Sequence, residues 1–303
     1  MIQTKYTISL LGSSGFIGQS LLQHIKNATG LSLRDPSWKA FLKETDVIIN
    51  LVGKAHDHQG TATEQDYYDA NVELAKEVFE AFSASDAKLL IHVSSLAALE
   101  EFESSEALTE QATSNPTSWY GKSKRAAEEW LLAQELAEDK RLIILRPPMV
   151  HGAGDKGNLG LLYKLISKGI PYPLAVFNNE RSFISIDNFC FFIQQLLEKR
   201  ERIESGIYHI SDDESIATSD IIQIIKSVTG KNTMKLVIPK KLVELLARFG
   251  DIIPIPLNSK RLKKMTSSLV VSNQKIKTAL GIEKLPLTAE EGLIKTIQSF
   301  RGL

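Results

Sequence analysis

The chain has 303 residues, which is enough for one large domain or for two modest ones. Apolar residues make up 43% and charged residues 24%, as in ordinary globular proteins, and the formal net charge of zero argues against nucleic acid as a partner. A single cysteine, Cys190, excludes an intramolecular disulfide framework, and no stretch reaches the ~20 apolar residues of a membrane span. These features predict a cytoplasmic protein without a membrane span.

Short apolar runs alternate with helical patterns through the first half of the chain. The predicted strands are 7–11, 31–33, 47–52, 89–94 and 142–146, and the predicted helices are 16–27, 38–43, 63–83 and 120–138. Strand and helix in alternation indicate parallel βαβ units with helices on both faces of one sheet. The predicted fold class is therefore α/β, with a Rossmann-type doubly wound parallel sheet.

After Arg146 the alternation gives way to loops rich in glycine and proline and to shorter elements. We predict helices that end at Gly169 and Gly230 and short strands in "RSFISIDN" and "GIYHIS". The tail contains a helix with four apolar residues on one face and a basic stretch that we expect to be solvated: Leu242, Leu245, Leu246, Phe249 and "SKRLKK" at 259–264. This half predicts a smaller mixed α/β C-terminal lobe folded against the sheet.

Three glycines in "LLGSSGFIGQSLL" follow the first strand and open the first helix. Gly12 permits a tight turn, Gly15 lets the backbone approach a pyrophosphate, and Gly18 lets the helix pack on the sheet. The helix N-terminus then offers unpaired N–H groups to the phosphates. The alternative is a glycine-rich βα turn without a ligand; a P-loop is excluded because no Gly-Lys-Ser/Thr follows.

The segment "LSLRDPSW" lies where a dinucleotide site reads the adenosine ribose. Asp35 would bind the ribose hydroxyls of NAD, whereas Arg34 could pair with the 2′-phosphate of NADP. Both residues are present side by side, so these two residues leave the choice between NAD and NADP open. The cofactor that we expect for the protein as a whole is NAD, with NADP possible.

Tyr120 and Lys124 in "WYGKSKRAAEEWLL" are four residues apart and lie on one face of a predicted helix. A free tyrosine has a pKa of ~10, and a neighbouring ammonium group together with an oxidised nicotinamide would favour the phenolate. Ser94 and Ser95 end the fourth predicted strand, at the edge of the sheet where open parallel sheets bind ligands. A hydroxyl there could hold a substrate alcohol while the tyrosine moves its proton.

As a set, several segments resemble the extended short-chain dehydrogenases that act on nucleotide sugars, the NAD-dependent epimerase/dehydratase family. They are GSSGFIG, "DVIINLVGKAH", "NVELA", "HVSSLA", "TEQATSNPTSWYGKSKRAAE", "LRPPMVHGAG", "RSFISIDN" and "VVSNQKIKTALGI". The likeness spans nearly the whole chain and is strongest to UDP-hexose 4-epimerases and UDP-4-keto-sugar reductases. It departs from the family at Glu100, usually glycine, and at His151, usually tyrosine.

The resemblance implies a role for each matching residue. Tyr120 would be the catalytic acid/base, Lys124 would bind the nicotinamide ribose, and Ser95 would hydrogen-bond the reacting C4 oxygen. The implied cofactor-binding residues are Gly12, Ser14, Gly15, Phe16, Ile17, Gly18, Arg34, Asp35, Leu51, Val52, Ser94, Tyr120, Lys124 and Pro147. The implied substrate-binding residues are Lys54, Ser95, Asn158 and Arg181, the last two at the diphosphate.

The same resemblance implies two domains and a dimer. A dinucleotide-binding domain would comprise 1–155 with 182–211 returning to it, and a nucleotide-sugar-binding lobe would comprise 156–181 and 212–303. Helices 63–83 and 120–138 would pair in a homodimer. In "KAHDH", Lys54, His56 and His58 lack a third metal ligand at suitable spacing, so we expect no metal site.

The reaction is narrowed by the residues that follow Ser95. Dehydratases of the family place an Asp–Glu pair there, and this chain has Leu96 and Ala97, so dehydration is not expected. Two C4 redox reactions stay open: 4-epimerisation of a UDP-hexose of the UDP-glucose/UDP-galactose type, and reduction of a UDP-4-keto-6-deoxy sugar. A third hypothesis is a non-catalytic dinucleotide-sensing protein.

Overall fold

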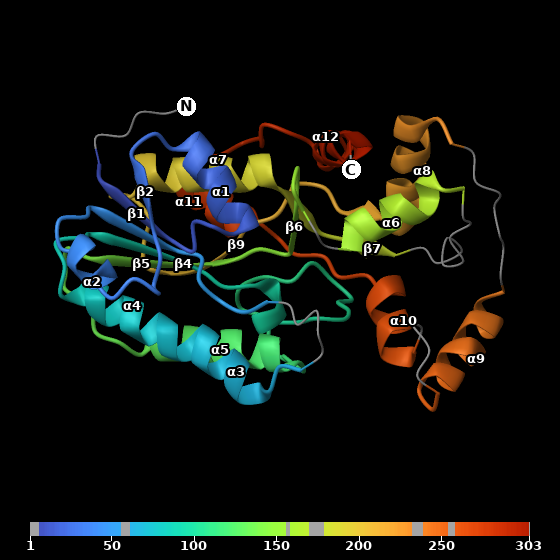
Figure 1. Cartoon of the computed structure of the whole chain (residues 1–303), viewed down its shortest axis with the longest axis horizontal. Coiled ribbons are helices and arrows are strands. Elements are labelled where there is room, and N and C mark those ends of the chain that lie inside the picture. Colours follow the sequence, from blue (N-terminus) through green and yellow to red (C-terminus); the bar gives the residue numbers. More distant parts are fainter. Residues whose placement is uncertain are drawn as a thin grey trace.

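A six-stranded parallel sheet organises the chain, with strand order β2-β1-β3-β4-β5-β9 (Figure 1). The computed structural model describes residues 6–55, 61–155, 158–169, 179–231, 239–253 and 258–302. The strands are β1 (Ile8–Leu11), β2 (Ala28–Leu31), β3 (Val47–Asn50), β4 (Leu89–Val93), β5 (Arg141–Arg146) and β9 (Gly206–His209). The predicted Rossmann-type α/β fold is confirmed.

Helices cover both faces of this sheet (Figure 1). One face carries α1 (Phe16–His24), α7 (Ile186–Glu198) and α11 (Gln274–Leu280); the other carries α2 (Trp38–Phe41), α3 (Glu64–Tyr68), α4 (Leu74–Ser83) and α5 (Trp119–Leu132). Successive strand residues alternate between two cores, so Ile49 faces α1 and α7 while Ile48 faces α4. Burial on both faces explains the continuous apolar runs of the strands.

The second strand begins three residues earlier than predicted. The apolar residues Leu31 and Leu33 favoured a strand at 31–33, but β1 pairs instead with Ala28–Leu31. Gly30 permits this register, because a Cβ there would lie 2.5 Å from the Ser13 hydroxyl oxygen. Tertiary pairing therefore overrides local propensity in this strand.

The remaining elements form a second layer beside the sheet. Its helices α6 (Asn158–Ser167), α8 (Thr218–Thr229) and α12 (Ala289–Ser299) share one apolar core. Its other elements are β6 (Met149–His151), β7 (Glu180–Arg181), β8 (Phe183–Ser185), β10 (Ile216–Ala217), α9 (Lys240–Gly250) and α10 (Ser259–Thr266). Between these lobe elements the chain returns to the sheet through α7 and β9; the domain boundaries given above stay a prediction.

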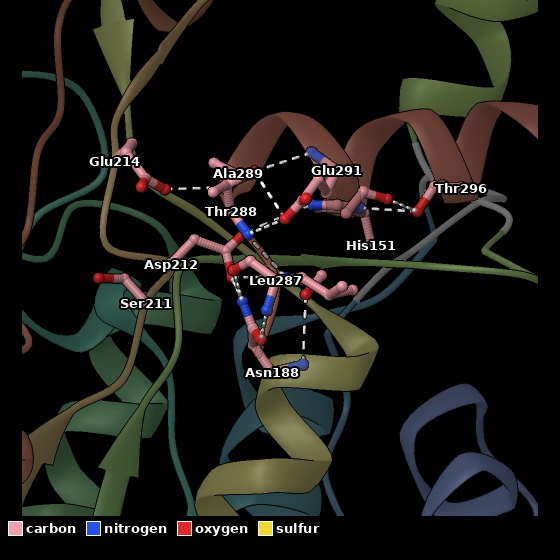
Figure 2. Close-up of polar contacts among 12 residues, drawn as sticks. His151, Asn188, Ser211, Asp212, Glu214, Leu287, Thr288, Ala289, Glu291 and Thr296 are labelled. Atoms are coloured by element: carbon pink, nitrogen blue, oxygen red, sulfur yellow. Dashed lines mark hydrogen bonds and ion pairs between the residues drawn. The ribbon is translucent and has the colours of Figure 1, made fainter. Parts of the chain in front are cut away.

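A buried polar network joins the sheet layer to the lobe (Figure 2). Asp212 accepts hydrogen bonds from the Ser185 main-chain N–H (3.1 and 3.2 Å) and from Asn188 Nδ2 (2.7 Å). Asn188, on α7, also donates to the main-chain oxygen of Leu287 (2.8 Å) and accepts from its N–H (3.2 Å). Leu287 immediately precedes the capped start of α12, so this network fixes that helix to the sheet layer.

We predict that Asn188→Ala destabilises the fold by ~3 kcal/mol, since it removes the buried hydrogen bonds that Asn188 makes with Asp212 and with the main chain of Leu287. Urea unfolding measures the change. Asn115→Ala is the matched control, because Asn115 is exposed and its side chain makes a long 3.4 Å contact with Glu100. An equal loss in both variants would contradict the role assigned to the network.

Candidate active site

The glycine turn lies between β1 and α1, against the segment that follows β3. Gly12 has φ +81°, a conformation that favours glycine, and a Cβ there would approach the backbone of Leu51 and Val52 to 3.1–3.2 Å. At Gly18 a Cβ would lie 2.5 Å from the Gly12 carbonyl oxygen. The turn is therefore closed around Gly12, and α1 packs directly on it.

The start of α1 has the form of an anion-binding cradle. Gly15 is the N-cap residue and provides no side-chain cap, so the N–H groups that open the helix at Phe16 and Ile17 are not capped by it. Ser14 and Gly15 are exposed. A Cβ at Gly15 would lie 3.4 Å from the Gly12 carbonyl oxygen and would narrow the approach to these N–H groups. Such an arrangement fits the pyrophosphate of a dinucleotide.

Arg34 and Asp35 lie in the turn that follows β2, at the edge of the sheet, and both are exposed. One Asp35 carboxylate oxygen accepts hydrogen bonds from the Ser37 N–H (2.9 Å) and hydroxyl (2.6 Å). The hydroxyl bond, followed by the main-chain bond, lowers the pKa of Asp35, so the carboxylate is ionised at neutral pH. The turn thus places the Asp35 carboxylate next to the Arg34 guanidinium, where a bound dinucleotide would carry its adenosine ribose. NAD has a free hydroxyl on this ribose and NADP has a 2′-phosphate.

Ser95 and Tyr120 lie together at the carboxyl end of β4. Ser95 follows β4 and caps the short 3₁₀ helix Leu96–Ala98, whose Ala97 N–H donates to its hydroxyl (3.2 Å). Tyr120 is the second residue of α5, and its phenol lies close enough to the Ser95 side chain for that side chain to affect the pKa of Tyr120. Burial raises the pKa of Tyr120, the Ser95 side chain lowers it, and the carboxylates of Glu101 and Glu128 raise it further.

The chain by itself therefore keeps the tyrosine neutral. Without a cofactor, the pKa of Tyr120 is raised above that of a free tyrosine. The pKa of Lys124 is lowered to about 8 by burial, partly offset by the Glu128 carboxylate. An oxidised nicotinamide beside Tyr120 would add positive charge that favours the phenolate.

Lys124 is buried one turn after Tyr120 and is held from two sides. Its Nζ donates to the Val93 carbonyl oxygen at the end of β4 (3.1 Å). A Cβ at Gly53 would lie 2.9 Å from that Nζ and 2.6 Å from the Asn71 oxygen, so a larger residue there would displace one or both of these side chains. Asn71 also bonds the Lys54 main chain (2.8 and 3.1 Å) and the Ser123 hydroxyl (2.8 Å). It thereby ties the loop after β3 to α5.

A buried ion pair anchors the middle of α5. Glu128 accepts from Arg146 Nε (2.9 Å) and Nη2 (2.5 Å) in a bidentate pair, and from the Ser94 hydroxyl (2.5 Å). Glu128 and Arg146 are almost wholly inaccessible to solvent. Because Ser94 follows β4 and Arg146 ends β5, one carboxylate fixes α5 to two central strands. Tyr120, Lys124 and Glu128 lie four residues apart on the same helical face.

A second carboxylate holds the N-terminus of α5. Glu101 accepts from the Thr117 N–H and hydroxyl (both 2.9 Å) and from the Ser118 N–H (2.7 Å) and hydroxyl (2.6 Å). Ser118 is the N-cap of α5 and accepts from the Gly121 N–H (3.0 Å). Burial raises the pKa of Glu101, but these hydrogen bonds outweigh it and keep the carboxylate ionised. Tyr120 is thus oriented from both ends of its helix.

The other predicted site residues lie around this centre at different depths. Leu51 and Val52 contact the glycine turn, and the Pro147 carbonyl accepts from the Leu96 N–H (2.8 Å) beside Ser95. The Lys54 ammonium lies 5.7 Å from the centre of the Tyr67 ring, whose centroid is 6.5 Å from that of Tyr120.

The two predicted diphosphate ligands belong to the lobe. Asn158 is the first residue of α6, and its side chain lies outside the described part of the structure, as do His56 and His58. Arg181, on β7, donates from Nη1 to the carbonyl oxygens of Ser267 (3.1 Å) and Phe102 (3.4 Å). Phe102 lines a cavity of about 470 Å³ between the loop after Ser95 and α10. The described residues contain no cluster of three potential metal ligands.

Four residues of this arrangement carried no assigned role in the sequence analysis: Asn71, Glu101, Glu128 and Arg146. A signal existed for Glu128, because it follows Lys124 by four residues on a helix face that is otherwise buried. Arg146 ends an apolar strand, where a charge requires a partner. Glu101 gave no such signal, because its partners lie 16 and 17 residues away across a loop.

Comparison with known proteins identifies the protein family to which the chain belongs. The family model of the NAD dependent epimerase/dehydratase family matches residues 8–211. The chain is 27% identical to a UDP-glucose 4-epimerase of Vibrio cholerae, over 97% of this chain and 95% of that protein. It is 24% identical to the N-acetyl-alpha-D-glucosaminyl-diphospho-ditrans,octacis-undecaprenol 4-epimerase of Escherichia coli O157:H7, over 96% and 94% of the two chains.

A solved structure agrees in fold. The UDP-glucuronic acid 4-epimerase from Bacillus cereus, in complex with NAD, superposes with a TM-score of 0.77 at 17% identity, covering 98% of this chain and 99% of that one. The chain belongs to the NAD dependent epimerase/dehydratase family, and it is an enzyme of that family. None of its described helices is long and apolar enough to cross a bilayer.

We predict that Glu128→Gln lowers the free energy of unfolding by about 3–5 kcal/mol, because it leaves the Arg146 charge buried without its carboxylate. Urea titration measures the loss. Glu129→Gln on the same helix is the matched control, since Glu129 is exposed and pairs with Arg125 at the surface; we expect a change within about 0.5 kcal/mol. Similar effects of the two substitutions would show that the buried pair does not anchor α5.

Proposed function

We propose that the protein is a UDP-hexose 4-epimerase of the UDP-glucose/UDP-galactose type. The observation that carries the proposal is that Ser95 and Tyr120 lie together beside the buried Lys124, at the sheet edge that also carries the glycine turn. A hydroxyl, a phenol and an ammonium group in this order suit proton transfer at a sugar alcohol. Two relatives that span nearly the whole chain are 4-epimerases, which supports the same reaction.

The bound dinucleotide would accept a hydride from C4 and return it to the other face of the sugar. Tyr120 would take the proton of the C4 hydroxyl as the C4 hydrogen leaves, which produces a 4-ketone. It would give the proton back to the C4 oxygen when the hydride returns. Ser95 would hold that oxygen by a hydrogen bond throughout, so the acid and base roles fall on one residue.

In this proposal the chain holds the cofactor as NAD along one edge of the sheet. The backbone at Gly12, Ser14, Gly15, Phe16, Ile17 and Gly18 would bind the pyrophosphate, and Asp35 would bind the adenosine ribose. Lys124, with Tyr120, would bind the nicotinamide ribose, and Leu51, Val52, Ser94 and Pro147 would line its path. Arg34 next to Asp35 keeps NADP as the second choice.

The substrate would span the gap between the two layers. Arg181 and Asn158 would bind the diphosphate and Lys54 the sugar, which puts the nucleotide on the lobe. Two copies would pair through α4 and α5 as a cytoplasmic homodimer. These assignments rest on the family resemblance and on the positions of α6 and β7 in the lobe.

A UDP-4-keto-6-deoxy-sugar 4-reductase is the second candidate, because it would use the same three residues and differ only in releasing the oxidised cofactor. Dehydration is not proposed, since Leu96 and Ala97 occupy the positions where a second acid and base would be needed. A non-catalytic dinucleotide sensor would not require the buried anchoring of Lys124.

We predict that the protein interconverts UDP-galactose and UDP-glucose and that Tyr120→Phe reduces kcat by about 10²–10⁴-fold, since it removes the acid/base. Chromatography of the two nucleotide sugars measures turnover. Tyr208→Phe is the control, because Tyr208 lies on β9 and its hydroxyl donates to the Glu204 carbonyl oxygen. Oxidation of NADPH by a UDP-4-keto sugar, without interconversion of the hexoses, would instead establish the reductase.

We also predict that Glu101→Gln moves the acid limb of the pH–activity profile to lower pH. The Glu101 charge raises the pKa of Tyr120, so its removal allows the phenolate to form at lower pH. Glu100→Gln is the control for loss of a carboxylate elsewhere in this loop. We expect the acid limb of its pH–activity profile to stay at the wild-type pH. A limb that moves equally in both variants would contradict a specific effect of Glu101.

A further inference from the structure

The helix α9 exposes a stripe of large apolar side chains. Leu242, Leu245, Leu246 and Phe249 are each 44–54% exposed, and Ile252 and Ile253, just past the helix, are 83% and 55% exposed. We call these six residues the outer stripe. A side chain of this size gains free energy when it leaves water, so six of them side by side indicate a surface that meets another apolar phase.

The outer stripe is distinct from the face by which α9 packs on its own chain. Val243 and Ala247, four residues apart, are buried, and α9 contacts α10. The four exposed helical residues follow the spacing i, i+3, i+4 and i+7, which places them on a separate face. Among the described residues, α9 therefore has one apolar face that packs on its own chain and a second one that is exposed.

Basic residues are concentrated in the same region. Lys241 and Arg248 are exposed on α9, on the polar side that adjoins the outer stripe. The neighbouring α10 reads SKRLKKMT, and its exposed Lys263 pairs with Glu103. Together α9, α10 and their immediate flanks at 239–253 and 258–266 contain seven basic and two acidic residues, in a chain whose formal net charge is zero. The local charge is thus strongly positive.

The position of α9 leaves this surface accessible. In Figure 1, α9 lies at one end of the longest axis of the molecule, and the sheet edge with β2 and α2 lies at the other end. A flat partner could meet this end without touching the sheet. A second copy of the chain is a poor partner for the same surface, because two basic regions would face each other.

We propose that the outer stripe docks on a lipid bilayer whose headgroups are anionic. The apolar residues would enter the boundary between headgroups and acyl chains, and the exposed Lys241 and Arg248 would meet the lipid phosphates. The protein would bind peripherally, since none of its described helices spans a membrane. This inference goes beyond the proposed epimerase and does not depend on it.

Co-sedimentation with vesicles tests the proposal. We expect the full-length protein to bind vesicles of phosphatidylglycerol and phosphatidylcholine in equal parts, and to bind vesicles of phosphatidylcholine alone about tenfold or more weakly. Phe249→Glu should weaken binding to the anionic vesicles by about tenfold. Its matched control is Phe41→Glu, because Phe41 on α2 is 59% exposed against 54% for Phe249 and belongs to the opposite end of the molecule.

Thermal unfolding of both variants shows whether each is folded. A folded Phe249→Glu variant that binds anionic vesicles as the wild type does would overturn the proposal. So would equal loss in the Phe41→Glu variant, or equal binding of the wild type to both kinds of vesicle. If the protein binds neither kind but self-associates in sedimentation velocity, and Phe249→Glu abolishes that association, the stripe is a contact between copies and the lipid proposal is wrong.

Discussion

The bidentate contact between Glu128 and Arg146 is the constraint on which the position of the candidate catalytic residues depends. Two charges are taken out of water here, and removing one partner of such a pair typically costs several kcal/mol. The pair, together with Ser94, fixes how α5 is shifted along its axis and rotated about it relative to β4 and β5. The pair therefore also fixes Tyr120 and Lys124, because these residues lie two turns and one turn before Glu128 on the same face of α5.

The protein and the cofactor have opposite effects on the protonation of Tyr120. Burial and two carboxylates raise the pKa of Tyr120, and burial lowers the pKa of Lys124 to about 8. The chain alone thus holds a neutral phenol near an ammonium group that loses its proton more readily than a free lysine does. A positively charged nicotinamide would favour the phenolate, so base strength would follow the redox state of the cofactor. Because the base strength of Tyr120 would change with the redox state of the cofactor, proton transfer would be coupled to hydride transfer.

The sequence predicted those parts of the structure that local chemistry determines. The turn at Gly12 and Gly18 was predictable because only glycine fits its backbone, and the parallel sheet followed from the alternation of apolar runs with helical patterns. The register of β2 was not predictable, since pairing with β1 decides it. Nor was the role of Glu101, whose partners at Thr117 and Ser118 meet it only through tertiary folding. Long-range contacts leave no periodic signal in the chain.

If the glycine turn holds a dinucleotide that serves Ser95 and Tyr120, the purified protein should carry that dinucleotide. This is measured by purifying the protein without added cofactor, denaturing it, and identifying any released nucleotide by chromatography. We expect NAD⁺ at close to one equivalent, because an epimerase retains its hydride carrier through each cycle, and none from Gly18→Ala, where a Cβ would lie 2.5 Å from the Gly12 carbonyl oxygen. Wild-type protein that carries no dinucleotide and binds neither NAD nor NADP when they are added would show that the glycine turn is not a dinucleotide site.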